Sequence, residues 1–418
     1  MGPTLLFDKS ALQALSIDES VWLDQFFLPV ICPIFYVETL ADLEKAIRAG
    51  RTPEQEVGLI AARTPEVHGY PNVFHGQLCV ANIQGYPVPL DGRPAIAGGQ
   101  PVRAGNRTGL KFDVAPEAEA FGRWQEGKFL EIERKYAAAW RASLSHLSFD
   151  EVIEELKKIK IIPEKCKTLE EAKKIADAIV NSRDRPFEVM AVTFALLGIP
   201  PQLSRPVLER ASAMGYPSLA SFAPYVAHVL SVEIFFYVAV AASQISKEWV
   251  TNKIDLAYLY YLPFCKIFTS GDKLHRRCAP YFLRDGQQFV WAQDLKNDLK
   301  NIDVFFDTLP ENEKEKGLFT IAGHPPKDGD YLVSKLWDAY LPGWRTRPET
   351  KPPKDPDAEK KLVEHLRKFT DAEPLEPDEV DFDVNDPENL ALARKVRRRK
   401  GKWWQVPKDL KSSDTDKE

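Results

Sequence analysis

Four acidic residues carry the chemistry that this sequence suggests most strongly. They are Asp8, Glu38, Asp255 and Asp272. Carboxylate oxygens are the ligands that Mg²⁺ and Mn²⁺ prefer in proteins. One or two such ions can activate water and neutralise the charge that builds on a phosphate during phosphodiester hydrolysis. Four carboxylates aimed at one point therefore predict a metal-dependent site for this reaction.

Two short apolar runs are predicted to place two of these acids. Residues 4–7 (TLLF) read as a buried strand that ends at Asp8, and residues 265–269 (CKIFT) read as a second strand. A Ser-Gly-Asp turn follows the second run and ends at Asp272. Side chains that follow the carboxyl ends of strands in an α/β sheet converge at one edge. We therefore expect these two acids to be neighbours.

The other two acids are predicted to lie on helices. Apolar spacing predicts a helix from about 33 that stops at Gly50, and it carries Glu38. Asn252 is predicted to cap a helix that starts directly after it and ends at Pro263. Asp255 would then lie in the first turn, where the helix dipole favours a carboxylate.

The remaining elements are predicted from caps, periodicity and turn residues. Ser16 and Glu19 form a capping-box pattern for a helix that reaches about Phe27. Residues 64–128 are rich in glycine and proline, which predicts short strands and loops. Further helices are expected at 131–160, from 168, within 184–246 and at 287–306.

In the order and local context of the four acids, the sequence resembles the PIN-domain nucleases, the superfamily of toxin-type endoribonucleases and related flap-type nucleases. The segments that carry the resemblance are LLFDKSAL, VETLADL, KIDLAYL and FTSGDKLH. The resemblance implies an α/β fold with a small parallel sheet flanked by helices. It also implies that Asp8, Asp255 and Asp272 hold Mg²⁺ or Mn²⁺, with Glu38 as a ligand or water-orienting base.

The resemblance also sets the expected domain organisation. It covers about 1–60 and 215–310, and the chain between them is far longer than a compact PIN domain needs. We expect a first part of a PIN-like domain, a large mixed insertion, a second part, and a charged, mostly disordered tail whose proline and charge content disfavours a packed core. The boundaries are 1–63, 64–214, 215–344 and 345–418.

Contacts with nucleic acid must come from local basic patches, because the formal net charge is -5. Lys273, His275, Arg276 and Arg277 follow Asp272 directly and are candidates for phosphate contact, although a solvated helix start explains them equally well. A basic run with two tryptophans, ARKVRRRKGKWWQ, lies in the tail. It suits either single-strand binding or docking of a partner.

The composition favours a soluble protein of the cytoplasm that does not cross a membrane. Five scattered cysteines form no CxxC pair, which argues against a disulfide framework or a zinc knuckle. The apolar stretch 222–242 is long enough to span a membrane, but it contains His228 and Glu233. An ionised glutamate near a bilayer centre costs roughly 3 kcal/mol. A buried core helix is the preferred interpretation.

Together these observations predict a metal-dependent endonuclease that hydrolyses phosphodiester bonds, with RNA favoured over DNA. The alternative is a non-catalytic PIN-like module that binds a protein or RNA partner. The long insertion and the acidic net charge support that alternative. An inhibitory protein partner is compatible with either hypothesis. Cleavage that depends on Mg²⁺ or Mn²⁺ would separate the two.

Overall fold

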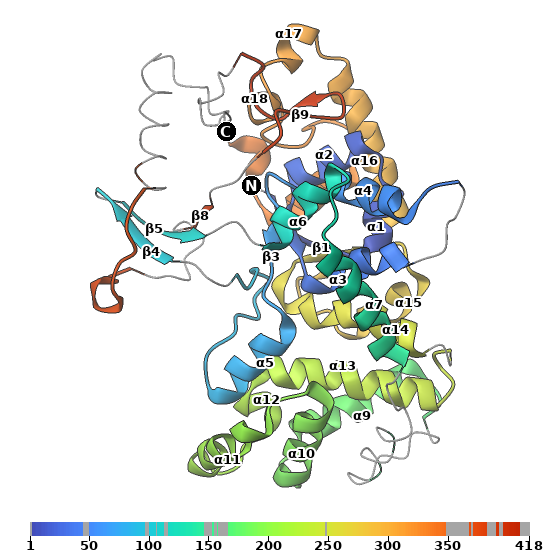
Figure 1. Ribbon diagram of the computed structural model, residues 1–418, viewed down its shortest axis with the longest axis vertical. Helices are drawn as coiled ribbons and strands as arrows, with labels where there is room; N and C mark the ends of the chain where they lie inside the picture. The colour runs from blue at the N-terminus through green and yellow to red at the C-terminus, as the bar shows by residue number, and fades with distance from the viewer. Residues whose placement is uncertain are drawn as a thin grey trace.

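A five-stranded parallel sheet lies at the centre of the computed structural model (Figure 1). Its strand order is β3-β2-β1-β6-β7, and every neighbouring pair is parallel. From β1 the chain adds β2 and β3 on one side, and it later adds β6 and β7 on the other. The strand order therefore reverses between β1 and β6. The strands are β1 (Thr4–Phe7), β2 (Leu28–Ile31), β3 (Tyr70–Pro71), β6 (Ile267–Ser270) and β7 (Gln288–Trp291).

The structure describes most of the chain between residues 2 and 409. The described residues are 2–44, 50–96, 100–105, 107–112, 116–145, 153, 157, 166–246, 249–347, 368, 371–382, 390–392 and 396–409. The end of the helix predicted to stop at Gly50, part of the helix predicted at 131–160 and most of the predicted tail lie outside these ranges.

Two helices of the first part of the chain, α2 and α3, begin where the sequence predicts. The capping box of Ser16 and Glu19 is present at the start of α2, and Pro33 occupies the first turn of α3. Ring contacts show how α3 meets the sheet, since Phe35 packs edge-on against Phe7 of β1. The elements are α1 (Lys9–Ala14), α2 (Ile17–Phe26), α3 (Pro33–Leu40), η1 (Ala41–Glu44) and α4 (Pro53–Arg63).

The second part returns to the sheet after the insertion. The Trp22 ring of α2 stacks on Phe306 of α16 with centroids 4.6 Å apart, so these two helices share an aromatic layer. The elements are α14 (Trp249–Ala257), η4 (Tyr258–Phe264), α15 (Lys273–Cys278), η5 (Ala279–Tyr281), α16 (Ala292–Asp307), α17 (Glu311–Lys314), α18 (Leu318–Ile321), α19 (Leu332–Tyr340) and η6 (Trp344–Thr346).

The chain between 64 and 241 forms a helical lobe, further helices that pack against the first part of the chain, and a separate hairpin (Figure 1); the lobe extends past the expected end of the insertion at 214. The lobe surrounds α13 (Pro224–Ala241), which is long and apolar enough to cross a membrane; 83% of it is buried inside the protein. The other helices are α5 (His75–Gln84), α6 (Pro116–Gln125), α7 (Glu131–Ser145), α9 (Leu169–Asn181), α10 (Pro186–Leu197), η3 (Pro201–Leu203), α11 (Ser204–Ala213) and α12 (Leu219–Phe222). The hairpin joins β4 (Gln100–Ala104) to β5 (Arg107–Phe112).

Described pieces of the predicted tail are folded against the rest of the chain. Strand β8 (Leu390–Leu392) pairs in parallel with β5 of the insertion, and η7 (Pro377–Glu379) precedes it. Residues 396–409, which we call the C-terminal strap, contain the hairpin of β9 (Arg399–Lys400) and β10 (Trp403–Trp404). Within the strap the expectation of disorder is not met, because Trp403 is fully buried.

The structure differs from the predicted elements at three places. Residues 28–31 form a strand that the sequence analysis does not predict, because Pro29 lies in it and proline is unusual inside a sheet. The helix predicted at 287–306 is preceded by strand β7, so its first residues belong to the sheet. The helix that carries Asp255 begins at Trp249 rather than after Asn252, which places Asp255 near its end.

Candidate functional site

The candidate site lies at the switch point of the sheet. Asp8 directly follows β1, and Asp272 follows β6 by two residues. Ligands of open α/β sheets bind in the crevice at the carboxyl ends of the strands, where the strand order reverses. The two strands pair in parallel through Leu5 and Ile267, so their carboxyl ends share one edge. The two acids predicted to follow strands are therefore neighbours at this edge.

Asp8 is held by a dense set of hydrogen bonds. It is the N-cap of α1 and accepts a hydrogen bond from the backbone N–H of Ala11 at 2.8 Å. Two hydroxyls donate to it: Ser10 to both carboxylate oxygens, at 2.7 and 2.9 Å, and Ser270 to Oδ2, at 2.7 Å. The side chain is only 4% exposed. Its position is consequently fixed by contacts from both α1 and β6.

The same two serines connect the turn after β6 to the start of α1. Ser10 Oγ accepts from the backbone N–H of Gly271 at 2.9 Å, and Ser270 Oγ accepts from the backbone N–H of Asp272 at 2.9 Å. Asp272 in turn caps α15 by accepting from Leu274 N–H at 2.5 Å. The Ser-Gly-Asp turn is thus both a helix cap and one wall of the site.

His275 is a buried cation beside Asp8. Its Nδ1 lies 3.2 Å from Asp8 Oδ2 and 2.8 Å from Ser270 Oγ, and its Nε2 donates to the backbone carbonyl of Asp255 at 2.5 Å. Burial alone would lower the pKa of His275, but the hydrogen bond and charge of Asp8 raise it to about 9. Burial would raise the pKa of Asp8, and the contacts with His275, Ser270 and Ser10 lower it below its usual value.

Glu38 is approached from both sides by polar groups. Lys9 Nζ lies 3.0 Å from Glu38 Oε1 and 3.0 Å from Asp42 Oδ1, and Tyr258 donates its hydroxyl to Glu38 Oε2 at 2.6 Å. Lys9 is nearly buried. Burial would lower the pKa of Lys9, but Glu38 and Asp42 raise it. A cation in the first turn of α1 opposes the helix dipole, so the two acids stabilise it there.

Asp255 is the acid whose charge is least compensated. Burial raises the pKa of its carboxyl, His275 opposes that shift, and the charges of Glu38, Asp272 and Asp8 raise it further, to about 7. These are the other three acids that the sequence predicts for the site. The four carboxylates therefore share one electrostatic environment.

The residues around the acids only partly match the predicted substrate contacts. Lys273, Arg276 and Arg277 are exposed on α15, whereas His275 is 1% exposed and holds Asp8 instead of facing solvent. Lys9 and Tyr258 are absent from the sequence-based site. Lys9 carries a usable signal, since a lysine in a helix's first turn needs nearby acids; Tyr258 has no such signal.

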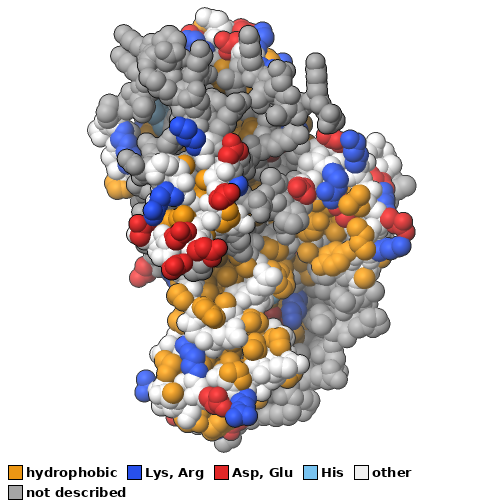
Figure 2. All heavy atoms as spheres, turned by 60° about the vertical axis from the view of Figure 1, so that its left-hand side comes forward, with side chains coloured by type: hydrophobic (Ala, Val, Ile, Leu, Met, Phe, Trp, Pro, Cys, Tyr) orange, Lys and Arg blue, Asp and Glu red, His pale blue; other side chains and the backbone are white. Residues whose placement is uncertain are grey.

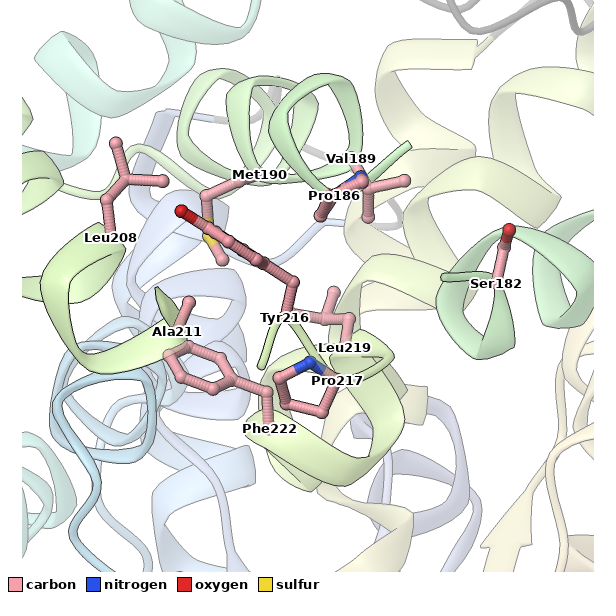
Figure 3. Close-up of a pocket in the computed structure, with 10 residues that line it drawn as sticks. All are labelled: Ser182, Pro186, Val189, Met190, Leu208, Ala211, Tyr216, Pro217, Leu219 and Phe222. Carbon is pink, nitrogen blue, oxygen red and sulfur yellow. The ribbon is translucent and has the colours of Figure 1, made fainter. Parts of the chain in front are cut away.

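Two hollows elsewhere contain none of the four acids. An apolar pocket in the insertion is lined by residues such as Met190, Tyr216 and Phe222, with no carboxylate or cation (Figure 3). Hydrophobic side chains also gather on the lower lobe, over α10–α12 (Figure 2). A cleft of about 250 Å³ is lined partly by Lys173 and Asp177, which pair with each other at 2.5 Å. Neither hollow combines groups suited to phosphodiester hydrolysis.

No protein-family model matches this chain, and no curated protein or solved structure matches it. The parallel sheet flanked by helices is compatible with a PIN-like fold. The functional interpretation therefore depends on the order of the acids along the chain and on their placement in this sheet.

Proposed function

We propose that this chain is a PIN-like, metal-dependent endonuclease that hydrolyses phosphodiester bonds, with RNA as the favoured substrate. The observation that carries the proposal is the placement of Asp8 and Asp272 at the strand-order switch point, with the backbone carbonyl of Asp255 bonded to His275 beside Asp8. Burial is the largest cause that raises the pKa of Asp255, and the charges of the other three acids of the predicted site raise it further, to about 7. Carboxylates at a strand-order switch point are ligands of the kind that a divalent cation binds.

The donor set fits Mg²⁺ or Mn²⁺ by its chemistry. Asp8, Asp255 and Asp272 would hold the ion, with Glu38 as a ligand or as the base that orients water. Within the described residues, however, no three carboxylate, histidine or cysteine groups are gathered around one point. Asp8 is turned toward His275 and Glu38 toward Lys9. Binding of a cation would compete with these two internal cations for the same oxygens.

The bound ion would supply an activated water and neutralise charge on the phosphate. The chain's own residues would do the rest. Ser10 and Ser270 orient the Asp8 carboxylate, and Tyr258 orients that of Glu38. His275 fixes the carbonyl of Asp255 at the end of α14. Lys273 is exposed in the first turn of α15, next to Asp272, where it can contact a phosphate.

Cleavage of a labelled single-stranded RNA tests the proposal. The parent should cut in millimolar Mn²⁺ or Mg²⁺ and not in chelator. Asp255→Asn and Asp8→Asn should lower the rate about 100-fold or more, because a metal ion contributes several kcal/mol to the transition state. Asp330→Asn is the matched control, since that side chain is 86% exposed and lies outside the site. Equal rates in all four proteins would overturn the proposal.

A second candidate function is a non-catalytic PIN-like module that binds RNA or a protein partner. The observation in its favour is that three acids of the pocket already have internal cationic partners: Lys9 pairs with Glu38 and Asp42, and His275 pairs with Asp8. A module of this kind would retain RNA and release no products in any metal. Replacing Lys9 or His275 would then destabilise the protein without affecting any cleavage rate.

The proposal also places the protein in the cytoplasm, free of the membrane. All five cysteines are free and buried, which suits a reducing compartment. The apolar helix α13 packs inside the insertion lobe, and its Glu233 pairs with Lys253 of α14. Fractionation of cells that express the full chain would test this part: recovery in the membrane pellet would contradict it.

A further inference from the structure

An aromatic ring and a guanidinium form a stack at the same edge of the sheet as the four acids. Trp291 is the last residue of β7 and pairs in register with Ser270 of β6. The guanidinium carbon of Arg276, on α15, lies 5.0 Å from the centroid of the Trp291 ring. Arg276 is exposed, and Trp291 is partly exposed. We call this pair the Trp291–Arg276 platform.

The platform adjoins the turn that carries Asp272. A Cβ placed on Gly271 would lie 3.8 Å from Cβ of Ala292, the residue that follows Trp291. Ser270, which pairs with Trp291 in the sheet, donates its hydroxyl to Asp8. A strand of nucleic acid whose phosphate lay against the acids would therefore reach the platform with a neighbouring nucleotide.

We propose that the Trp291–Arg276 platform stacks an unpaired base and so makes single-stranded nucleic acid the substrate class of the site. This inference rests on the proposed nuclease function. Indole and guanidinium planes both stack on bases, and such contacts are tolerant of sequence because every base has a flat face. Bases inside a duplex are already stacked and are not available to the ring.

The charges on α15 support the same assignment. Lys273, Arg276 and Arg277 are exposed along this short helix between the acids and Trp291. Arg277 also donates a hydrogen bond of 3.0 Å to the backbone carbonyl of Gln244, which fixes the direction of its side chain. In a chain of net charge -5, this local basic segment offers backbone phosphates a place to bind.

Binding measured in chelator separates recognition from cleavage. The probe is a fluorescein-labelled strand of about 12 nucleotides, as RNA and as DNA, and the same sequence as a duplex. Trp291→Ala should weaken single-strand binding about 10-fold, as expected for one lost stacked base. Trp291→Phe should retain most of the affinity, and it keeps an aromatic ring at the start of α16. Arg276→Ala should reduce the salt dependence of binding.

A second Trp–Arg stack in the chain is the matched control. The Arg399 guanidinium carbon lies 5.4 Å from the centroid of the Trp404 ring in the C-terminal strap. The basic run that contains Trp404 is itself a candidate for single-strand binding, so the prediction is comparative: Trp404→Ala should lower the affinity less than Trp291→Ala does. A series of probes, each lacking the base at one position, extends the test. For one of these probes the parent and Trp291→Ala should bind equally well, because the base that stacks on the ring is missing. A purely structural role of Trp291 would not produce this result. Equal duplex and single-strand affinities, or equal losses in both tryptophan variants, would overturn the platform.

The outcome for the platform is independent of the outcome for catalysis. If the parent cuts RNA in Mn²⁺ while Trp291→Ala binds and cuts as well as the parent, the nuclease proposal stands and the platform is wrong. If the parent cuts nothing in any metal but loses single-strand affinity on Trp291→Ala, the platform stands and the nuclease proposal is wrong.

Discussion

The charge of Asp255 controls the behaviour of the acidic pocket at the residue scale. Its pKa of about 7 means that the folded protein binds a proton there which the unfolded chain, with an ordinary aspartate pKa of 3.8, releases above pH 4. The parent therefore loses stability as pH rises from about 4 to 7, and above pH 7 the loss is constant.

Asp255→Asn should remove this pH-dependent loss. In chelator the variant should be more stable than the parent, with an advantage on the order of 2 kcal/mol larger at pH 8 than at pH 5. Thermal melts of both proteins at the two pH values measure it. Added Mn²⁺ should raise the melting temperature of the parent and not of the variant, because the ion stabilises the folded state by mass action.

Asp272→Asn is the matched comparison for that experiment. Asp272 caps α15 through the backbone N–H of Leu274, and asparagine is as good an N-cap as aspartate. Because the charge of Asp272 is only one of the causes that raise the pKa of Asp255, we expect a smaller gain in metal-free stability for this variant than for Asp255→Asn. A gain for Asp272→Asn as large as that for Asp255→Asn would contradict the special status of Asp255.

His275 gives the pocket a second pH dependence. Its pKa rises from 6.5 to about 9 on folding, so the stabilisation is complete below pH 6.5 and disappears as pH rises through 9. The His275→Gln variant should lack this pH-dependent stabilisation. In chelator, denaturant titrations at pH 6, 7.5 and 9 should show the parent losing on the order of 3 kcal/mol relative to the variant. Titration of the buried cysteines contributes equally to both proteins and so drops out of the difference. If the stabilities of parent and variant changed in parallel with pH, a charged His275 would be excluded.

At the element scale, α14 depends on α13 of the helical lobe. Lys253 of α14 pairs with Glu233 of α13 at 3.2 Å and donates to the Tyr237 hydroxyl at 2.8 Å. Glu233 also accepts a hydrogen bond from the Tyr260 hydroxyl of η4. Asp255 lies two residues beyond Lys253. The contacts from α13 therefore fix α14, the helix that carries Asp255.

Lys253→Met should destabilise the protein by about 3 kcal/mol, because Glu233 is then buried without its cation. The double variant Glu233→Leu with Lys253→Met should recover most of that loss, since it buries no charge. Chemical denaturation measures both. Lys335→Met is the control, since its partner Asp330 is exposed and surface pairs contribute under about 1 kcal/mol. No recovery in the double variant would argue against a buried pair.

Elements near the acids show what a sequence alone can predict. Strand β1, strand β6 and the capping box of α2 follow from local signals that lie within a few residues. Strand β2 does not, because Pro29 is accepted there only through pairing with β1 and β3. The start of α14 was misplaced, because Asn252 is a cap by propensity alone, whereas the helix already begins at Trp249.

The charge partners of the site were predictable only in part, for a similar reason. Asp8, Glu38, Asp255 and Asp272 belong to a chain-order pattern. The role of His275 depends on its being buried between β6 and α14, which no local signal indicates. A run of three basic residues beside an acid reads as a solvated helix face unless the fold buries one of them.

At the scale of the whole molecule, the C-terminal strap fastens the tail to the first part of the chain. Trp403 packs edge-on against Trp22 with ring centroids 4.7 Å apart, and its indole N–H donates to Asp303 at 2.8 Å. The fully buried Lys400 donates to the carbonyl of Thr64 at 2.9 Å. Gly401 adopts a positive φ beside Asp18, where any Cβ would collide with the carboxylate.

Removing residues 396–418 should lower stability, whereas removing 410–418 should not. The point variant Trp403→Ala should cost about 3–5 kcal/mol, as for other buried large aromatic residues. Trp404→Ala should cost under about 1 kcal/mol, because that ring is partly exposed. Denaturant midpoints of these four variants and the parent give the comparison. A truncated chain as stable as the parent would mean that the strap only rests on the surface.

The tail was expected to be disordered because its composition is rich in proline and charge. Composition averages over a segment, and it cannot show that Trp403 and Lys400 meet partners more than 300 positions earlier in the chain, as Lys400 and Thr64 do. Short anchored stretches inside a polar tail are therefore missed by any argument that uses only averages.

The central position of β1 has a consequence for the order in which this protein is made. Asp8 and Ser270 lie 262 positions apart. At 5–20 residues per second, a ribosome adds β6 roughly 10–50 s after β1. Throughout that interval one edge of the central strand lacks its neighbour, and the acids cannot share a pocket. The nascent chain therefore keeps an open sheet edge until β6 has left the exit tunnel, and under the proposed nuclease function it could not cleave RNA before then.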